Sequence, residues 1–364
     1  NVTSRGYMAF YSCSSLASVV IPDSVTSIGG VAFGLCNSLE SVVIPCKVTS
    51  IGNDAFYKCE NLKKVILMEG VTSIGKNMFK ECLNLASVKI PNSVTFIDPS
   101  AFRECRSLAS IDIPDSVTRM GSGAFYRCSS LESVVIPGGV DSINAAIFRE
   151  CSSLKKVTLM EGVTSIGSFA FRDCSSLKSI KIPVGVTSIG SSAFKGCSSL
   201  VSVVIPDSVT SIEHSAFDGC SSLNNVIIPK SVTSIEQYTF SECKSLASVV
   251  IPDSVTSIGI QAFEFCDSLN NVVIPDSVTS IGTKAFYQCK SLATVVIPDN
   301  VRIGNNAFNG CGCYQYMYKP GVKLCDCEES DDWPCPEPTT AAPTTAAPTT
   351  SSTELTGIET ISST

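Results

Sequence analysis

The sequence predicts a repeat solenoid, mainly β with short helical turns. Cysteine recurs every 23 residues thirteen times from Cys13 to Cys289, and a fourteenth, Cys311, follows after 22. A phenylalanine stands three residues ahead of each of these cysteines, from Phe10 to Phe308. Short apolar segments rich in valine and isoleucine recur at the same interval. A period of this length over most of a chain indicates one supersecondary unit stacked many times.

Two β-type segments open each repeat. In the representative unit, residues 16–38, the first segment spans 16–21 and is rich in β-branched side chains. Pro22 ends it, because proline cannot donate a hydrogen bond to a strand ladder. The second segment, 25–28, is closed by Gly29. Each coil of the solenoid is therefore expected to carry two short strands.

A short turn of helix around Ala32 and Phe33 is expected to complete the coil and to end at Cys36. One coil cannot bury its apolar residues alone. Stacked coils should therefore form continuous columns of leucine, valine, isoleucine, phenylalanine and cysteine. A polar substitution in such a column should cost several kcal/mol, because it loses apolar burial and leaves a polar group unpaired.

The fourteen periodic cysteines are predicted to be free thiols inside the core. Equivalent residues of neighbouring strands lie about 4.8 Å apart, with their side chains pointing the same way. A disulfide instead needs Cβ atoms about 3.8 Å apart that point toward each other. Buried free cysteine behaves as a small hydrophobic residue.

Five cysteines fall outside the period. They are Cys46, Cys313, Cys325, Cys327 and Cys335. The last four are disulfide candidates, with one or two bridges expected in a C-terminal cap, which fits an oxidising compartment. Zinc binding by the Cys-x-Cys pairs at 311/313 and 325/327 is the alternative, although structural zinc sites usually have wider spacing.

The predicted organisation has three parts. Residues 1–311 form the solenoid, about fourteen repeats that start in the middle of a repeat, so that the N-terminus is expected to be truncated. Residues 312–337 form the cysteine-rich cap, because a solenoid end exposes core and an unpaired strand. Residues 338–364 are rich in threonine, proline, alanine and serine, a composition typical of an extended, disordered, O-glycosylated stalk.

Charge and composition argue against several classes of function. The net charge is −7, but residues 1–310 carry 25 acidic and 24 basic side chains, against 8 and 2 in residues 311–364. A near-neutral solenoid has no basic face for nucleic acid. We also find no run of 18 apolar residues, so no membrane span is expected.

No catalytic constellation is apparent in the sequence. The one histidine, His214, lies at a variable position of the repeat, and no histidine recurs with the abundant serines. The glycines follow the 23-residue period rather than a phosphate-binding pattern. We therefore predict that the protein is not an enzyme and has no catalytic residue, metal site or cofactor.

The full repeat, Leu-x-x-Val-x-Ile-Pro-Asp-Ser-Val-Thr-Ser-Ile-Gly-x-x-Ala-Phe-x-x-Cys-x-Ser, resembles the BspA-type leucine-rich repeat over residues 1–311. The resemblance implies a leucine-rich-repeat right-handed superhelix, in which the Leu-x-x-Val-x-Ile segments form a parallel concave sheet. Proteins of this family are typically at the cell surface or secreted and are implicated in adhesion. The resemblance thus implies an extracellular or cell-surface protein whose partners are extracellular or host proteins, or glycans. Ser24 and its equivalents stand where leucine-rich repeats usually have asparagine.

The outward side chains of the first segments are the candidate ligand-binding residues. The fifth position of each is apolar in nine of thirteen repeats, and an exposed apolar stripe marks an interaction surface. The apolar members are Val20, Val43, Ile66, Val135, Val204, Ile227, Val250, Val273 and Val296, and the cationic candidates are Lys64, Lys89, Lys156 and Lys181. Strand propensity copied by repeat duplication also explains the valines, and duplication of a four-repeat block explains Lys64 and Lys156.

The leading hypothesis is a monomeric, non-enzymatic, adhesin-like protein that binds protein or glycan ligands through the concave sheet. Solenoids present extended surfaces that suit this role. Two alternatives stay open: a structural spacer of a cell wall or matrix, and an intracellular leucine-rich-repeat scaffold.

Overall fold

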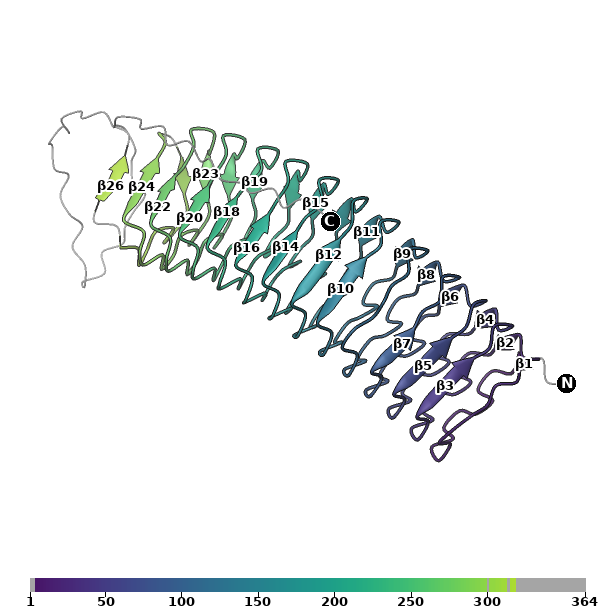
Figure 1. Cartoon of the computed structure of the whole chain (residues 1–364). Helices are drawn as coiled ribbons and strands as arrows, with labels where there is room; N and C mark the ends of the chain where they lie inside the picture. Colours follow the sequence, from purple (N-terminus) through teal and green to yellow (C-terminus); the bar gives the residue numbers. More distant parts are fainter. Residues whose placement is uncertain (1–3, 300, 313–314, 319–364) are drawn as a thin grey trace, which may run out of the picture. The chain divides into compact units, whose positions relative to one another are not determined.

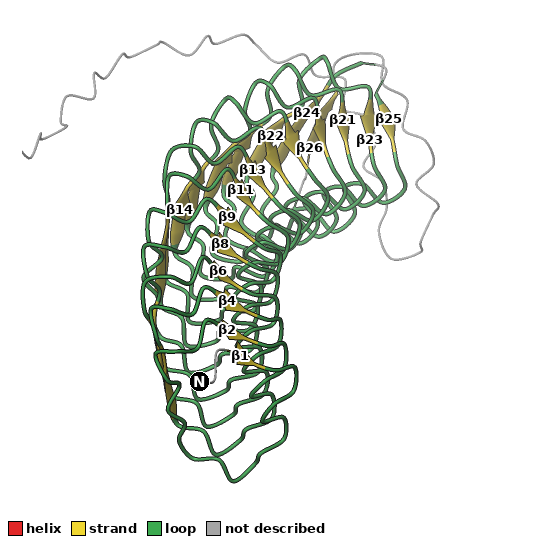
Figure 2. Cartoon of the chain, turned by 90° about the vertical axis from the view of Figure 1, so that its right-hand side faces the viewer, coloured by secondary structure: helices red, strands yellow, loops and turns green. Residues whose placement is uncertain are grey.

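The protein is a parallel-strand β-solenoid. The computed structural model describes residues 4–299, 301–312 and 315–318 (Figure 1). Most coils carry one long strand of three or four residues and one short strand of two residues, and these two sets of strands run along the solenoid as separate ladders (Figure 2). In two coils, isolated bridges at Ser18 and Ser110 stand in place of the long strand. The fold class predicted from the period is confirmed.

The long strands are β3 (Ser41–Ile44), β5 (Lys64–Leu67), β7 (Ser87–Lys89), β10 (Ser133–Ile136), β12 (Lys156–Leu159), β14 (Ser179–Lys181), β16 (Ser202–Val204), β18 (Asn225–Ile227), β20 (Ser248–Val250), β22 (Asn271–Val273), β24 (Thr294–Ile297) and β26 (Gln315–Tyr318). The short strands are β1 (Ser4–Arg5), β2 (Ser27–Ile28), β4 (Ser50–Ile51), β6 (Ser73–Ile74), β8 (Phe96–Ile97), β9 (Arg119–Met120), β11 (Ser142–Ile143), β13 (Ser165–Ile166), β15 (Ser188–Ile189), β17 (Ser211–Ile212), β19 (Ser234–Ile235), β21 (Ser257–Ile258), β23 (Ser280–Ile281) and β25 (Arg302–Ile303).

Neighbouring coils pair in parallel and in register. Val42 of β3 stands beside Val65 of β5, and Val65 beside Val88 of β7. A pairing offset of one whole repeat brings equivalent side chains together in every coil, which is why the sequence period becomes columns in the core. A slip of one residue would turn every buried side chain outward.

The long strands alternate between core and surface. In β3, Val42 and Ile44 are buried while Ser41 and Val43 are exposed, and β10 repeats this pattern. The fourth and sixth positions of the Leu-x-x-Val-x-Ile segment therefore point inward, and the fifth points outward, as predicted. The outward side chains of these strands form one surface, which we call the long-strand face.

No helical turn closes the coils in the part of the chain that the structure describes, so this detail of the prediction is wrong. In residues 29–36, Ala32, Gly34 and Cys36 donate backbone hydrogen bonds three residues back within their own coil. Val31, Phe33 and Leu35, which alternate with them, donate instead to backbone carbonyls of the next coil, over 2.7–2.9 Å. A helix would keep every one of these bonds within the segment.

Two residues of each such turn adopt a left-handed backbone conformation, and few of them are glycine. In the turn of residues 29–36 they are Val31, with φ of 55°, and Leu35, with φ of 62°. Equivalent pairs recur along the chain, for example Asn77 with Glu81. Because residues other than glycine rarely adopt this conformation, residue preferences gave no sign of these turns.

Val31→Asn should raise the free energy of unfolding by about 1 kcal/mol, because the left-handed conformation penalises a β-branched residue and tolerates asparagine. Asn77 and Asn306 already occupy the equivalent position in other coils, with φ of 54° and 57°. Urea denaturation followed by circular dichroism measures the change. Val20→Asn, at an exposed position of the long-strand face, is the control and should not stabilise. An equal or lower stability of Val31→Asn would contradict this explanation.

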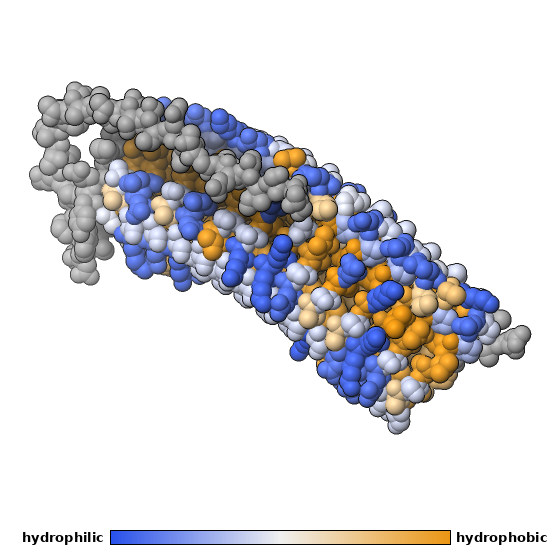
Figure 3. Space-filling model, viewed as in Figure 1, coloured by the Kyte–Doolittle hydropathy of each residue, from blue (hydrophilic) through white to orange (hydrophobic). Residues whose placement is uncertain are grey.

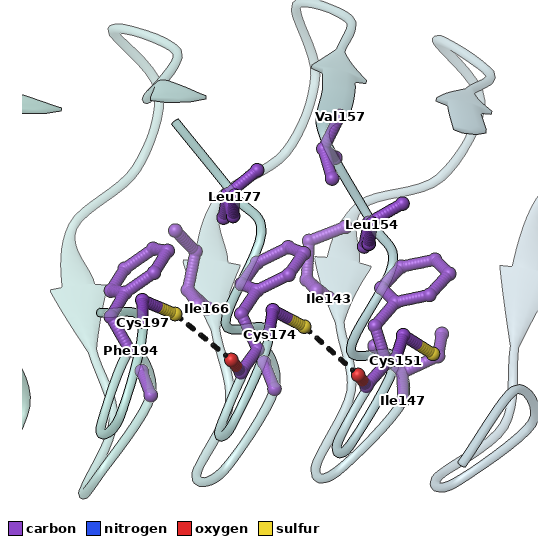
Figure 4. Packing of buried hydrophobic residues seen from close by; sticks show 14 of the residues in the cluster. Ile143, Ile147, Cys151, Leu154, Val157, Ile166, Cys174, Leu177, Phe194 and Cys197 are labelled. Atoms are coloured by element: carbon purple, nitrogen blue, oxygen red, sulfur yellow. Dashed lines mark hydrogen bonds between the residues drawn. The ribbon is translucent and has the colours of Figure 1, made fainter. Parts of the chain in front are cut away.

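The core is a set of stacked columns (Figure 4). The phenylalanine column runs from Phe10 to Phe308 with nearly parallel rings, and the centroids of neighbouring rings are 5.0–5.6 Å apart. From Phe33 to Phe286 the rings of this column are fully buried. Twelve cysteines, from Cys36 to Cys289, are buried beside them as free thiols, as predicted.

Each buried thiol has a hydrogen-bond acceptor in the preceding coil. The Cys174 thiol donates to the Phe148 carbonyl oxygen over 3.1 Å, and Cys197 donates to Phe171 over the same distance (Figure 4). The Phe148 carbonyl also accepts the backbone N–H of Cys151. Burial raises the pKa of the Cys36 thiol to about 11 and raises that of Cys174 as well. The column therefore consists of neutral thiols.

The ends of the cysteine column differ from the prediction of a fully buried ladder. Cys13 is exposed and Cys311 is half-buried, because each belongs to a terminal coil of the described solenoid and has a neighbour on one side only. The predicted replacement of an asparagine ladder is seen directly: the Ser254 and Ser277 hydroxyls each donate to a valine carbonyl of the preceding coil over 2.7 Å.

The long-strand ladder continues past residue 311. β26 pairs in parallel with β24, with Thr294 beside Gln315 and Ile297 beside Tyr318. Part of the segment expected to form the cap thus adds a strand to the sheet. The disulfide candidates Cys313, Cys325, Cys327 and Cys335 lie outside the described residues, so the cap, its bridges and the stalk stay predictions.

Candidate ligand-binding face

The C-terminal part of the long-strand face carries the longest unbroken row of exposed apolar side chains. Val204, Ile227, Val250 and Val273 are 69%, 71%, 60% and 66% exposed. They come from consecutive long strands, in which Ile227 stands beside Val250 and Val273 beside Val296. Val296 is half-buried. These side chains occupy the outward positions of a rigid sheet, so they form a stripe along the solenoid.

A second apolar group lies toward the N-terminus. Val20 is 84% exposed and Val43 is 50% exposed, whereas Ile66, in register with Val43, is half-buried. Val135 stands apart from this group and is 54% exposed. Apolar groups separated by hydrophilic ones are visible along this face of the molecule (Figure 3).

Two of the four candidate lysines, Lys89 and Lys181, interrupt the apolar stripe, and the other two lie beside it. Lys89 stands beside Ile66 and Lys181 beside Val204, and both are exposed. Lys64 and Lys156 are also exposed, at the outward position nearer the start of their strands. Within the described residues, none of the four takes part in an ion pair. Their charges face solvent, where an acidic group of a ligand can reach them.

The neighbouring lysines are engaged with acidic side chains. Lys63 lies 3.4 Å from Glu40, and Lys155 lies 3.1 Å from Glu132. All four side chains are more than half exposed, and exposed pairs of this kind contribute little to stability. The matching geometry of the two pairs fits the duplication of a four-repeat block.

Sequence reasoning missed several residues that widen the apolar surface. Met68 and Met160 follow β5 and β12 and are each 45% exposed. Val184 follows β14 and is 69% exposed, and Val201 precedes β16 and is 44% exposed. Met68 and Met160 stand where proline ends the equivalent strands of other coils. That replacement is the signal in the sequence that could have identified the two exposed methionines.

The histidine does not build a catalytic site. His214 is exposed, and its Nδ1 lies 3.2 Å from the Ser191 hydroxyl. A serine–histidine pair needs an acid to orient the imidazole, and in the described residues no carboxylate bonds to this ring. This geometry supports a surface contact between coils.

The described residues offer no further candidate site. No helix there is long and apolar enough to cross a membrane. No group of three or more histidine, cysteine, aspartate or glutamate side chains is arranged to hold a metal ion in that part of the chain.

The stacked coils, with a parallel ladder of outward-facing long strands, define a leucine-rich-repeat solenoid. The chain belongs to the BspA type leucine rich repeat family, whose model matches six copies over residues 1–109, 72–201 and 187–314. No curated protein matches the chain.

Bacterial proteins are among the solved structures with similar folds. A leucine-rich repeat protein from Bacteroides ovatus ATCC 8483 is 29% identical, with a TM-score of 0.69 over 84% of this chain and 92% of that one. A leucine rich cell surface protein from Faecalibacterium prausnitzii A2-165 is 32% identical, with a TM-score of 0.53 over 84% and 88%. A leucine-rich repeat protein from Eubacterium ventriosum ATCC 27560, 24% identical, with a TM-score of 0.52 over 77% and 85%, shares the fold.

Proposed function

We propose that the protein is a non-enzymatic binding protein of the cell surface or the extracellular space, and that the long-strand face holds its ligand. The observation that carries the proposal is the exposed row Val204, Ile227, Val250 and Val273. Exposed apolar surface costs free energy in water, and a continuous stripe of it marks an interaction site. The relative from Faecalibacterium prausnitzii is a cell surface protein, which supports the location.

A protein ligand suits this face best. Apolar side chains on a rigid sheet bury readily against apolar side chains of a partner, and the exposed lysines at the row's interruptions favour a partner with acidic groups. Affinity would then come from many shallow contacts along the sheet. Glycans, which present mostly hydroxyl groups, match this row less well.

Val135→Glu combined with Val204→Glu should weaken ligand binding at least tenfold, because two carboxylates in place of apolar side chains would have to be desolvated at the interface. Full-length protein is first screened against an array of extracellular-matrix proteins and mucins at physiological salt. The variant is then measured against each saturable hit.

The matched control places the same two charges on another surface of the solenoid. Thr187 and Thr210 are exposed beside the short strands, so Thr187→Glu with Thr210→Glu should leave affinity unchanged. Equal affinity of the Val135→Glu/Val204→Glu variant, with an intact circular dichroism spectrum, would remove the long-strand face as the binding site.

A structural spacer is the second candidate. The observation that favours it is the uniformity of the coils, which keep the same core columns from Ile21 to Phe308. A spacer needs a stiff rod and no specific ligand. Failure of folded protein to bind anything on the array would favour this role.

A further inference from the structure

A second surface of the solenoid departs from the repeat in a way that the proposed function does not use. It is formed by the turns between each short strand and the next long strand, and we call it the turn face. Five of the eight arginines in the sequence lie on it, within consecutive coils: Arg103, Arg106, Arg127, Arg149 and Arg172. The turns of residues 190–291 contain no arginine.

Carboxylates and an aromatic ring hold these guanidinium groups in place. Arg127 Nε lies 2.7 Å from a Glu150 carboxylate oxygen, and Arg149 Nε lies 3.2 Å from the other. The guanidinium carbons of Arg127 and Arg149 are 5.0 and 5.4 Å from the ring centroid of Tyr126. Contacts of both kinds fix the direction in which the remaining N–H groups point.

These side chains surround a shallow, open depression. Its lining residues come from four consecutive coils: Arg106, Arg127, Ser129, Glu150, Ser152 and Asp173. The side chains of Arg106 and Arg127 are 55% and 42% exposed. A guanidinium has five N–H donors, and one of those of Arg106 meets Glu104, over 2.9 Å. Donors therefore remain for a ligand.

The turn face around the depression is cationic. The five turns 75–84, 98–107, 121–130, 144–153 and 167–176 carry seven lysines and arginines against five carboxylates. The five turns that follow, between residues 190 and 291, carry four lysines against six carboxylates. A negatively charged ligand is thus attracted to the first group of turns and not to the second.

We propose that this depression binds an acidic polysaccharide, a polyuronate, that lies along the solenoid axis. Arg106 and Arg127 would pair with sugar carboxylates through charge-assisted hydrogen bonds. The hydroxyls of Ser129 and Ser152 and the carboxylates of Glu150 and Asp173 would bond the sugar hydroxyls. Carboxylates in the lining disfavour a ligand made of charge alone and suit one that also donates hydrogen bonds.

The polar lining favours a polysaccharide over an acidic peptide. Besides Arg106 and Arg127, the depression presents serine hydroxyls and the carboxylates of Glu150 and Asp173. Each sugar ring of a polyuronate carries one carboxylate together with hydroxyls that can donate to these carboxylates. The side chain of an acidic peptide residue brings the charge without such donors.

The test uses full-length protein and an oligomer of galacturonic acid as the probe, with calorimetry at physiological salt. Binding to the wild-type protein is expected. Arg106→Gln combined with Arg127→Gln should weaken it about tenfold or more, as expected for the loss of charge-assisted bonds. Lys284→Gln with Lys290→Gln removes two cations from one distant turn, residues 282–291, and should leave the affinity unchanged.

Three results would overturn the proposal. The first is no binding of the oligomer to folded wild-type protein. The second is equal affinity of the Arg106→Gln/Arg127→Gln variant, which would place the oligomer elsewhere. The third is that an acidic peptide, oligoglutamate, binds as tightly as the oligomer and that the Arg106→Gln/Arg127→Gln variant no longer binds it. The depression would then recognise charge only. Because the Val135→Glu/Val204→Glu variant alters a different face, failure here is separable from failure of the proposed function.

Discussion

Replacing Phe171 by alanine should lower the free energy of unfolding by about 3–5 kcal/mol, the range for large-to-small substitutions in a core. Phe171 is fully buried, and its ring stacks on Phe148 and Phe194 at centroid distances of 5.6 and 5.3 Å. In a solenoid each coil contacts only its neighbours. The lost ring therefore weakens the contacts on both sides of one coil, and no other layer of the core can compensate.

Phe169→Ala is the matched control for this prediction. Phe169 lies two residues away in the same turn, but it is half-buried and contacts mainly the guanidinium groups of Arg149 and Arg172. Its loss should cost less than about 1 kcal/mol. Urea denaturation monitored by circular dichroism measures both variants. Similar losses for the two would contradict the central role of the stacked column.

Alkaline pH should unfold the protein steeply. Burial raises the pKa of the thiols from Cys82 to Cys266 above the ordinary value of 9.0, so the folded state keeps these protons while the unfolded state releases them. The stabilisation is therefore complete below pH 9 and is lost as the pH rises above it. Above pH 9, each buried thiol therefore lowers the free energy of unfolding by about 1.4 kcal/mol per pH unit. Twelve cysteines are buried.

Parallel measurements of circular dichroism and thiolate absorbance between pH 7 and 10.5, in the presence of a reducing agent, test this linkage. We expect thiolate absorbance to appear together with the loss of structure. Thiolate formation by the buried cysteines in protein that keeps its native spectrum would refute the linkage.

The period alone specified most of the fold. A buried residue that returns every 23 positions can be buried only if coils stack in register, so the phenylalanine and cysteine columns and the inward positions of the long strands followed directly from spacing. The turns before the cysteines did not follow. Their hydrogen bonds alternate between their own coil and the next, and residues such as Val31 and Phe169 take left-handed conformations there, which local residue preferences cannot indicate.

The candidate binding face was predictable because alternation in a strand decides which side chains point outward. Val204 and Val250 could be assigned to the surface from their position in the repeat, and their exposure agrees. The turn face was not predictable. Arg106, Arg127 and Glu150 lie in three successive repeats, and only the stacking of coils brings them to one depression. No local pattern distinguishes them from ordinary surface variation.

The central claim is that ligand sits on the long-strand face, and hydroxyl-radical footprinting of full-length protein tests it most directly. The protein is footprinted with and without a ligand identified on the array. The proposal predicts protection of Val204, Ile227, Val250 and Val273, with little change at Tyr57 and Tyr126 of the turn face. Protection confined to the turn face, with these four aliphatic side chains labelled as strongly as in free protein, would contradict it.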